Sequence, residues 1–128
     1  HEESAAIANY DKAIHLNPKS VKAYIQRGKI LESSDTHGAL ESYSKAIMLS
    51  PRYFDAFYLR GCFRLKLHDS AGAIADFDKA TTIDQYHPDA HEKFGDALMM
   101  AGKEDAANIQ WALAERMAKR QLKKKKKK

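Results

Sequence analysis

The sequence predicts an all-α fold, an α-solenoid of antiparallel helix hairpins, and three observations lead to this prediction. The same residue types return at a nearly constant interval along the 128 residues. Between these positions, apolar residues recur at the spacing of an α-helix, and proline or polar residues stand at the joints. A repeat of this length is typical of stacked helical arrays, in which each unit packs on its neighbours.

Four columns of residues define the repeat. Alanines form two columns, aromatic residues a third and glycines a fourth, and successive members are 33 or 34 residues apart. The columns are Ala6, Ala39, Ala73 and Ala107; Ala13, Ala46, Ala80 and Ala114; Tyr10, Tyr43, Phe77 and Trp111; and Gly28, Gly61 and Gly95. Because the columns advance together, they indicate a structural repeat.

Each full unit contains two predicted helices. In chain order the predicted helices cover 21–33, 37–49, 54–66, 71–83, 88–100 and the residues from 104 onward. The predicted organisation is the second helix of a truncated repeat at 1–18, repeats at 19–51, 52–85 and 86–119, and a basic tail at 120–128. Prolines at the joints suit the first turn of a helix, as at Pro88.

The first predicted helix has no glycine-bearing helix before it in this sequence. We therefore expect the chain to be part of a longer array, with a natural capping helix as the alternative. Repeat arrays expose apolar faces at uncapped ends, so self-association through uncovered terminal helices is a further expectation.

The glycine column predicts how the hairpins close. Glycine inside a helix costs about 1 kcal/mol relative to alanine, so its return at Gly28, Gly61 and Gly95 needs a compensating contact. Close approach of the partner helix supplies that contact, since a side chain there would collide with it. The aromatic column is expected to fill the seam beside these small residues.

The segments AYIQRG, AFYLRG and AHEKFG, together with the alanine and aromatic columns, resemble the tetratricopeptide repeat. The resemblance implies a right-handed superhelix whose first helices line a concave groove for extended or helical peptides. It implies a non-catalytic scaffold or adaptor, with a protein or peptide partner and no cofactor. Arg64, His91 and Gln85 depart from the pattern, which affects local packing more than the fold.

The resemblance also places the groove residues by position. They are Lys22, Ile25, Gln26 and Lys29; Asp55, Tyr58, Leu59, Cys62 and Leu65; and Asp89, Glu92, Lys93, Asp96 and Met99. Their charges either match a ligand that is acidic at one end and basic at the other, or only keep the groove hydrated. Tyr58 is the expected aromatic anchor.

Some members of the family clamp the carboxy-terminal tails of chaperones, and this sequence lacks that set. Gln26 stands where the clamp needs a basic residue, and neither Ile25 nor Tyr58 supplies its lysine. No carboxylate clamp is therefore expected.

The basic character belongs to the C-terminus. Six of the 22 basic residues are Lys123, Lys124, Lys125, Lys126, Lys127 and Lys128, which leaves 16 against 17 acidic residues. Three interpretations of the tail are open: a solvated terminus; a localisation signal or a contact for nucleic acid, acidic protein tails or anionic membrane; and an intramolecular partner of Asp89, Glu92 and Asp96. An attachment module acting through the tail is the alternative function.

Catalytic and metal sites are not predicted. GDALMMAGKE has the wrong glycine spacing for a phosphate-binding loop, and Glu104 stands where that loop needs a hydroxyl. His87 and His91 are four residues apart but lack further evident ligands. Cys62 is the single cysteine, which excludes an intrachain disulfide and favours an intracellular compartment, cytoplasmic or nuclear.

Overall fold

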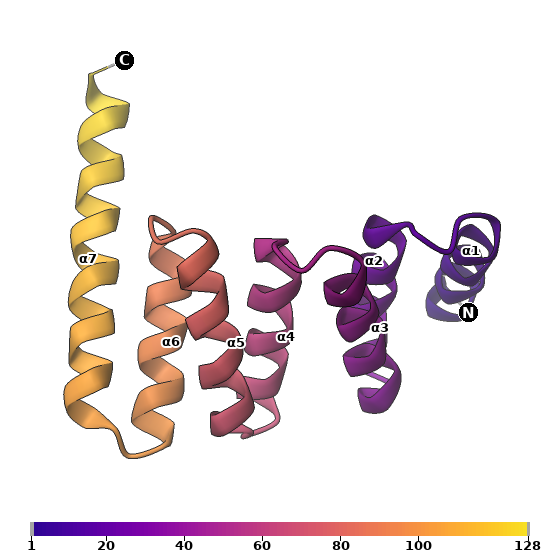
Figure 1. Cartoon of the computed structure of the whole chain (residues 1–128), viewed down its shortest axis with the longest axis horizontal. Helices are drawn as coiled ribbons and strands as arrows, with labels where there is room; N and C mark the ends of the chain where they lie inside the picture. Colours follow the sequence, from indigo (N-terminus) through magenta and orange to yellow (C-terminus); the bar gives the residue numbers. More distant parts are fainter. Residues whose placement is uncertain (1, 128) are drawn as a thin grey trace. The chain divides into compact units, whose positions relative to one another are not determined.

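The protein is described by a computed structural model that covers residues 2–127 (Figure 1). These residues form seven α-helices and no strand, so the predicted all-α fold is confirmed. The helices are α1 (Glu2–Leu16), α2 (Val21–Leu31), α3 (Thr36–Leu49), α4 (Phe54–Lys66), α5 (Ser70–Ile83), α6 (Pro88–Met100) and α7 (Glu104–Lys126).

Side-chain caps fix where several helices begin. Asp35 accepts a hydrogen bond from the backbone N–H of Gly38 at 2.9 Å, and Asp69 accepts one from Gly72 at 2.9 Å. A cap that satisfies an otherwise free N–H stabilises the first turn. Helices α3 and α5 therefore each begin one residue earlier than the apolar pattern predicts.

The chain divides into two compact units, residues 1–60 and 61–128. In the first unit α2 packs between α1 and α3, and Ala39, Tyr43 and Ala46 of α3 are fully buried. The ring of Tyr43 lies against Gly28, where a Cβ atom would stand 2.7 Å from Cε1 of the tyrosine. The absence of a side chain at Gly28 thus lets α2 and α3 approach closely.

The second unit repeats this packing. Helix α6 packs on α5 and forms an antiparallel hairpin with α7 (Figure 1). A Cβ atom at Gly61 would lie 2.9 Å from Cε1 of Phe77, which is fully buried, and one at Gly95 would lie closer still to Trp111. Each glycine of the column therefore faces the aromatic residue of the following helix.

A buried polar position accompanies each hairpin. Arg27 donates from Nη1 to Oγ of Ser42 at 2.7 Å, and Ser42 is 1% exposed. The position one repeat later is Asp76, which is paired with Arg64. Buried polar groups need such partners, and the second and third hairpins obtain theirs from residues that depart from the family pattern.

The third of these polar positions is Gln110, which is hydrogen-bonded to His91. Nδ1 of His91 lies 2.7 Å from Oε1 of Gln110, and its Nε2 lies 2.7 Å from the backbone oxygen of Gln85. His91 is 5% exposed, so it fills the place of a core aromatic residue while both ring nitrogens are hydrogen-bonded.

Helix α7 is the longest helix, with 23 residues, and it continues through the predicted tail to Lys126. No boundary separates the third repeat from the tail at 119–120 in the secondary structure. Within residues 2–127, no helix is both long enough and apolar enough to cross a membrane.

Candidate functional site

The predicted groove residues of α2 belong to the first unit. Lys22 and Lys29 are exposed and Gln26 is half-buried, whereas Ile25 is 5% exposed and packs in the hairpin core. Lys22, Gln26 and Lys29 lie three or four residues apart, so they share one face of the helix. This face offers two cations and an amide, while Ile25 stabilises the helix from behind.

A pocket of about 460 Å³ opens beside the α2 face. It is lined by Tyr10 and Ala13 of α1 and by Ser20, Lys22, Ala23 and Gln26 at the start of α2. Tyr10 belongs to the aromatic column and is half-buried. Two of the predicted groove residues, Lys22 and Gln26, thus line a real depression of the first unit.

Helix α4 carries the predicted apolar part of the site. Tyr58, Leu59, Cys62 and Leu65 are all half-buried, and Asp55 is exposed. The Tyr58 ring stacks on Phe54, with centroids 5.6 Å apart and planes 13° apart. This stacking restricts the rotation of Tyr58, which lowers the entropy that an aromatic anchor loses when a ligand binds.

Asp55 also affects a neighbouring phenol. Burial raises the pKa of Tyr53 above its ordinary value of 10.0, and the charge of Asp55 and a hydrogen bond to its carboxylate raise it further. The carboxylate of Asp55 is therefore held beside Tyr53 at the start of α4.

The predicted residues of α6 are mainly acidic. Asp89 and Glu92 are exposed, and Lys93 is half-buried. Asp96 is also half-buried and accepts a hydrogen bond from Nε1 of Trp111 at 3.1 Å. Met99 is 39% exposed at the end of the helix. Asp96 thus has a structural partner, whereas Asp89 and Glu92 present their carboxylates to solvent.

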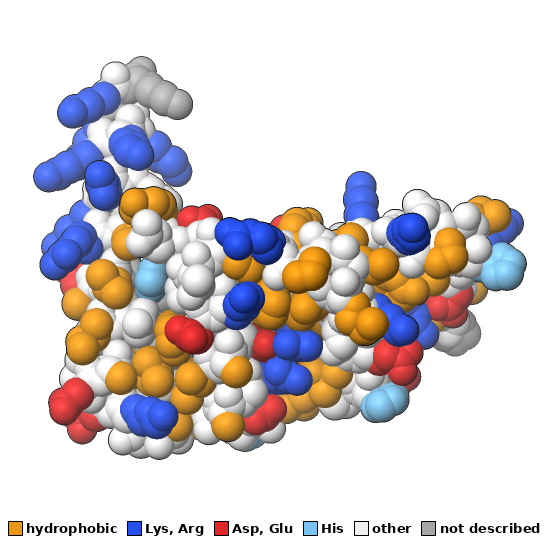
Figure 2. Space-filling model, in the orientation of Figure 1, with side chains coloured by type: hydrophobic (Ala, Val, Ile, Leu, Met, Phe, Trp, Pro, Cys, Tyr) orange, Lys and Arg blue, Asp and Glu red, His pale blue; other side chains and the backbone are white. Residues whose placement is uncertain are grey.

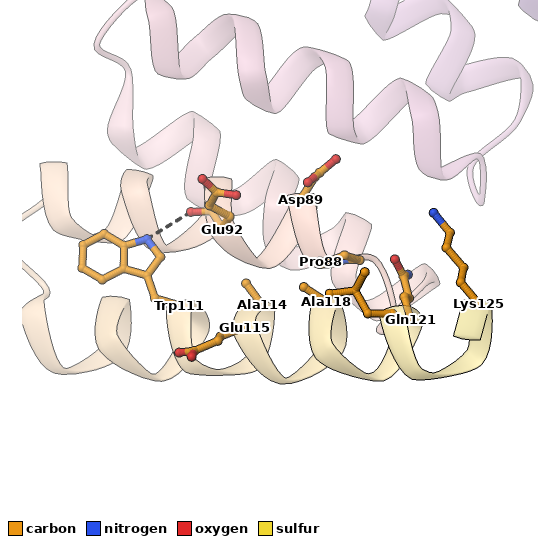
Figure 3. A pocket seen from close by; sticks show the side chains of 10 residues that line it. Pro88, Asp89, Glu92, Trp111, Ala114, Glu115, Ala118, Gln121 and Lys125 are labelled. Carbon is orange, nitrogen blue, oxygen red and sulfur yellow. Dashed lines mark hydrogen bonds between the residues drawn. The ribbon is translucent and has the colours of Figure 1, made fainter. Parts of the chain in front are cut away.

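A second pocket, of about 520 Å³, lies between α6 and α7 (Figure 3). Asp89 and Glu92 extend from α6 on one side, and Trp111, Ala118 and Lys125 follow one another along α7 on the other. Trp111 also donates from Nε1 to the backbone oxygen of Glu92 at 3.2 Å, which ties the two walls together.

The α7 wall of this pocket was not among the predicted site residues. It consists of Trp111, Ala114, Glu115, Ala118, Gln121, Leu122 and Lys125. These positions recur every three or four residues, which is the signal that they share a helical face. The repeat columns end at Ala114, whereas this helical face continues to Lys125. A prediction based on the columns therefore did not include these residues.

Residues 2–127 contain no assembled metal site. His87 caps α6 by accepting from the N–H of Ala90 at 3.3 Å, and both nitrogens of His91 are hydrogen-bonded in the hairpin. No group of three or more potential metal ligands occurs in this part of the chain. Cys62 is half-buried and forms no disulfide.

The tail lysines continue the helical surface of α7. Lys123, Lys124, Lys125, Lys126 and Lys127 are exposed, and Lys128 lies outside the described residues. Figure 2 shows Lys and Arg side chains gathered around the C-terminal part of α7. Arg116, Lys119, Arg120 and Lys123 line a further surface pocket there.

The family model of the tetratricopeptide repeat matches residues 54–87, which hold α4 and α5. The hairpin of α4 and α5 is therefore a tetratricopeptide repeat. The match covers the hairpin in which Gly61 faces Phe77. Curated proteins gave no sequence match to the chain.

Solved structures resemble this chain over most of its length. MamA covers 94% of this chain with 71% of its own, at 24% identity and a TM-score of 0.88. MamA from Desulfovibrio magneticus RS-1 covers 94% with 68%, at 19% identity and a TM-score of 0.82. These likenesses show the fold, an all-α helical-repeat solenoid.

YrrB, a TPR protein with an unusual peptide-binding site, is also similar. It covers 91% of this chain with 60% of its own length, at 26% identity and a TM-score of 0.78. The tetratricopeptide-repeat fold and these neighbours support a protein-interaction module.

Proposed function

We propose that this tetratricopeptide-repeat protein is a non-catalytic interaction module that binds an extended or helical peptide on the exposed faces of α2, α4 and α6. The proposal concerns the first helix of each repeat at 19–51, 52–85 and 86–119. Partners of this kind are protein segments, and the similarity to YrrB, with its peptide-binding site, supports the same class of ligand here.

The observation that carries the proposal is the position of the pockets. The pocket of the first unit includes Lys22 and Gln26, and the pocket of the second unit includes Asp89 and Glu92. The family resemblance placed these four residues in the groove by their position in the repeat. Depressions with polar groups at their edge are common binding sites, so the resemblance and the surface favour the same faces.

The chemistry of each face suggests what it binds. Lys22 and Lys29 suit acidic side chains, whereas Asp89 and Glu92 suit basic ones. The half-buried Tyr58 and Leu65 of α4 suit an apolar side chain, and aromatic anchors commonly supply most of the binding energy. Charges at the edges of such a face contribute more to specificity than to affinity.

The test begins with a peptide selected against the protein from a random peptide library. Its affinity is then measured by isothermal titration for Tyr58→Ala and Leu65→Asp. Tyr86→Ala and Leu16→Asp serve as controls, because Tyr86 is 58% and Leu16 76% exposed away from the predicted faces. We expect the α4 variants to weaken binding at least tenfold and the controls to leave it unchanged, with circular dichroism confirming the fold.

A second candidate function rests on the exposed lysines of α7. In this alternative the repeats are a spacer, and Lys123 to Lys128 attach the protein to acidic surfaces. Deletion of these six residues separates the two functions, because it leaves α2, α4 and α6 intact. If the tail carries the function, deletion abolishes binding to anionic vesicles or duplex DNA, and DNA affinity falls with salt by a log–log slope of about −0.9 per phosphate contacted.

A further inference from the structure

We propose that the pocket between α6 and α7 is one half of a two-fold interface with a second copy of this chain. In this dimer the α7 helices of the two copies lie antiparallel along the line from Glu115 to Lys125. Asp89 and Glu92 of this pocket also belong to the predicted groove set, but its α7 wall lies outside that set, and the inference does not depend on peptide binding.

The first argument is the exposed apolar stripe on α7. Leu122 is 58% exposed and Ala118 is exposed, and both line the pocket with Trp111 and Ala114. Phe77 and Ala80 of α5 stand one repeat before Trp111 and Ala114, and both are fully buried. Helix α6 packs against α5 there. A second helix on α7 would complete the same kind of packing.

The second argument is the order of charges along the pocket. Glu92 and Glu115 stand beside Trp111, Asp89 lies farther along the pocket, and Lys125 stands at the other end (Figure 3). A surface that runs from acid to base matches itself when a second copy is turned through a two-fold axis, because each end then meets its opposite. A uniformly basic or acidic partner would match only one end.

The third argument is the register that these residues share. Glu115 and Lys125 are both five residues from position 120, and Ala118 and Leu122 are both two residues from it. An antiparallel pair centred at position 120 places Glu115 beside the second copy's Lys125 and the large Leu122 beside the second copy's small Ala118. Large side chains against small ones are how helices interlock.

The basic tails are compatible with this arrangement. Helix α7 is continuous to Lys126, and Lys125 lines the pocket that also contains Asp89 and Glu92. In an antiparallel dimer the two tails lie at opposite ends, and each runs over the carboxylates of the other copy. Arg116, Lys119, Arg120 and Lys123 line a different pocket on α7, away from the interface.

Sedimentation equilibrium of the full chain at low salt tests the proposal. We expect wild-type protein to dimerise, and Glu115→Lys and Lys125→Glu each to raise the dimer dissociation constant about tenfold or more, since two ion pairs become two like-charge pairs. A mixture of these two variants in equal amounts restores dimerisation, because both pairs are again opposite in charge in the heterodimer.

Two matched controls complete the design. Lys123→Glu changes the net charge as Lys125→Glu does but lies in the other pocket, so we expect it to leave the dissociation constant within about twofold. Leu122→Asp abolishes the dimer, whereas Ile109→Asp, at a residue that is 60% exposed on α7 outside the pocket, does not. A wild-type chain that stays monomeric, or a mixture that fails to restore the dimer, overturns the proposal.

Discussion

Nη1 of Arg64 lies 3.0 Å from Oδ2 of Asp76, whose side chain is only 3% exposed. Arg64 also approaches the cap residue Asp69, with Nε 3.9 Å from Oδ2. Arg64 departs from the aromatic residue that the family pattern favours at this position. The departure is explained by the buried carboxylate of α5, for which Arg64 supplies a positive partner.

Removal of this partner should destabilise the second unit. Arg64→Met keeps much of the side-chain volume but removes the charged hydrogen bond from Arg64 to the buried Asp76, so we expect a loss of about 1.5 to 3 kcal/mol in the free energy of unfolding, measured with urea. Lys119→Met is the control, because Lys119 and its partner Glu115 are 71% and 69% exposed. Its expected change is below about 1 kcal/mol, and equal losses would contradict the assignment.

The glycine column gives a prediction about shape. Gly95→Ala places a methyl group against Trp111, and we expect a loss of about 1 to 3 kcal/mol in the free energy of unfolding. The loss should shrink in a Trp111→Leu background, because the ring that the methyl group meets is gone. Gly102→Ala tests backbone strain instead, since Gly102 has φ +77° and open space around it.

The cost of Gly102→Ala should therefore be the same whether residue 111 is tryptophan or leucine. If the cost of Gly95→Ala is also the same with tryptophan and with leucine at position 111, Gly95 and Trp111 do not pack as described.

The alanine column gives a prediction about volume. Ala80→Leu adds three carbon atoms at a fully buried position of α5, and we expect a loss of about 1 to 3 kcal/mol in thermal and urea unfolding. Ala71→Leu on the exposed side of the same helix should change stability by less than about 0.5 kcal/mol. An unchanged melting curve for Ala80→Leu would show that this alanine column does not lie in the core.

Alkaline pH tests the environment of Tyr53. Since its pKa is raised in the folded protein, the neutral phenol contributes stability that is present below its unfolded pKa of about 10 and is lost as pH rises through the folded pKa. The stability of wild type relative to Tyr53→Phe should therefore fall above pH 10. Asp55→Asn should lower the midpoint of the Tyr53 phenolate absorbance change, and a midpoint that does not move would exclude Asp55 as a cause.

Much of the fold was predictable because small and aromatic residues recur in register. The contacts of Gly28 with Tyr43 and of Gly61 with Phe77 follow from that register, since only a close helix pair explains a repeated helical glycine. The starts of α3 and α5 were each missed by one residue, because the caps Asp35 and Asp69 act through hydrogen bonds that apolar spacing does not reveal.

The polar interior was less predictable. The partners of His91, which are Gln110 and the backbone of Gln85, lie 19 and 6 residues away in sequence and come from different elements. At the candidate site, the family resemblance placed Ile25 in the groove, but its side chain is buried. The pocket wall formed by Ala118, Leu122 and Lys125 depends on the extension of α7 beyond the repeat.

The most direct measurement of the central claim is an NMR titration of ¹⁵N-labelled protein with the selected peptide. If α2, α4 and α6 hold the ligand, the largest amide shifts will occur around Lys22, Tyr58 and Glu92, and the amides of Lys123 to Lys127 will not move. Shifts confined to the tail lysines, with α2, α4 and α6 unchanged, would contradict the account.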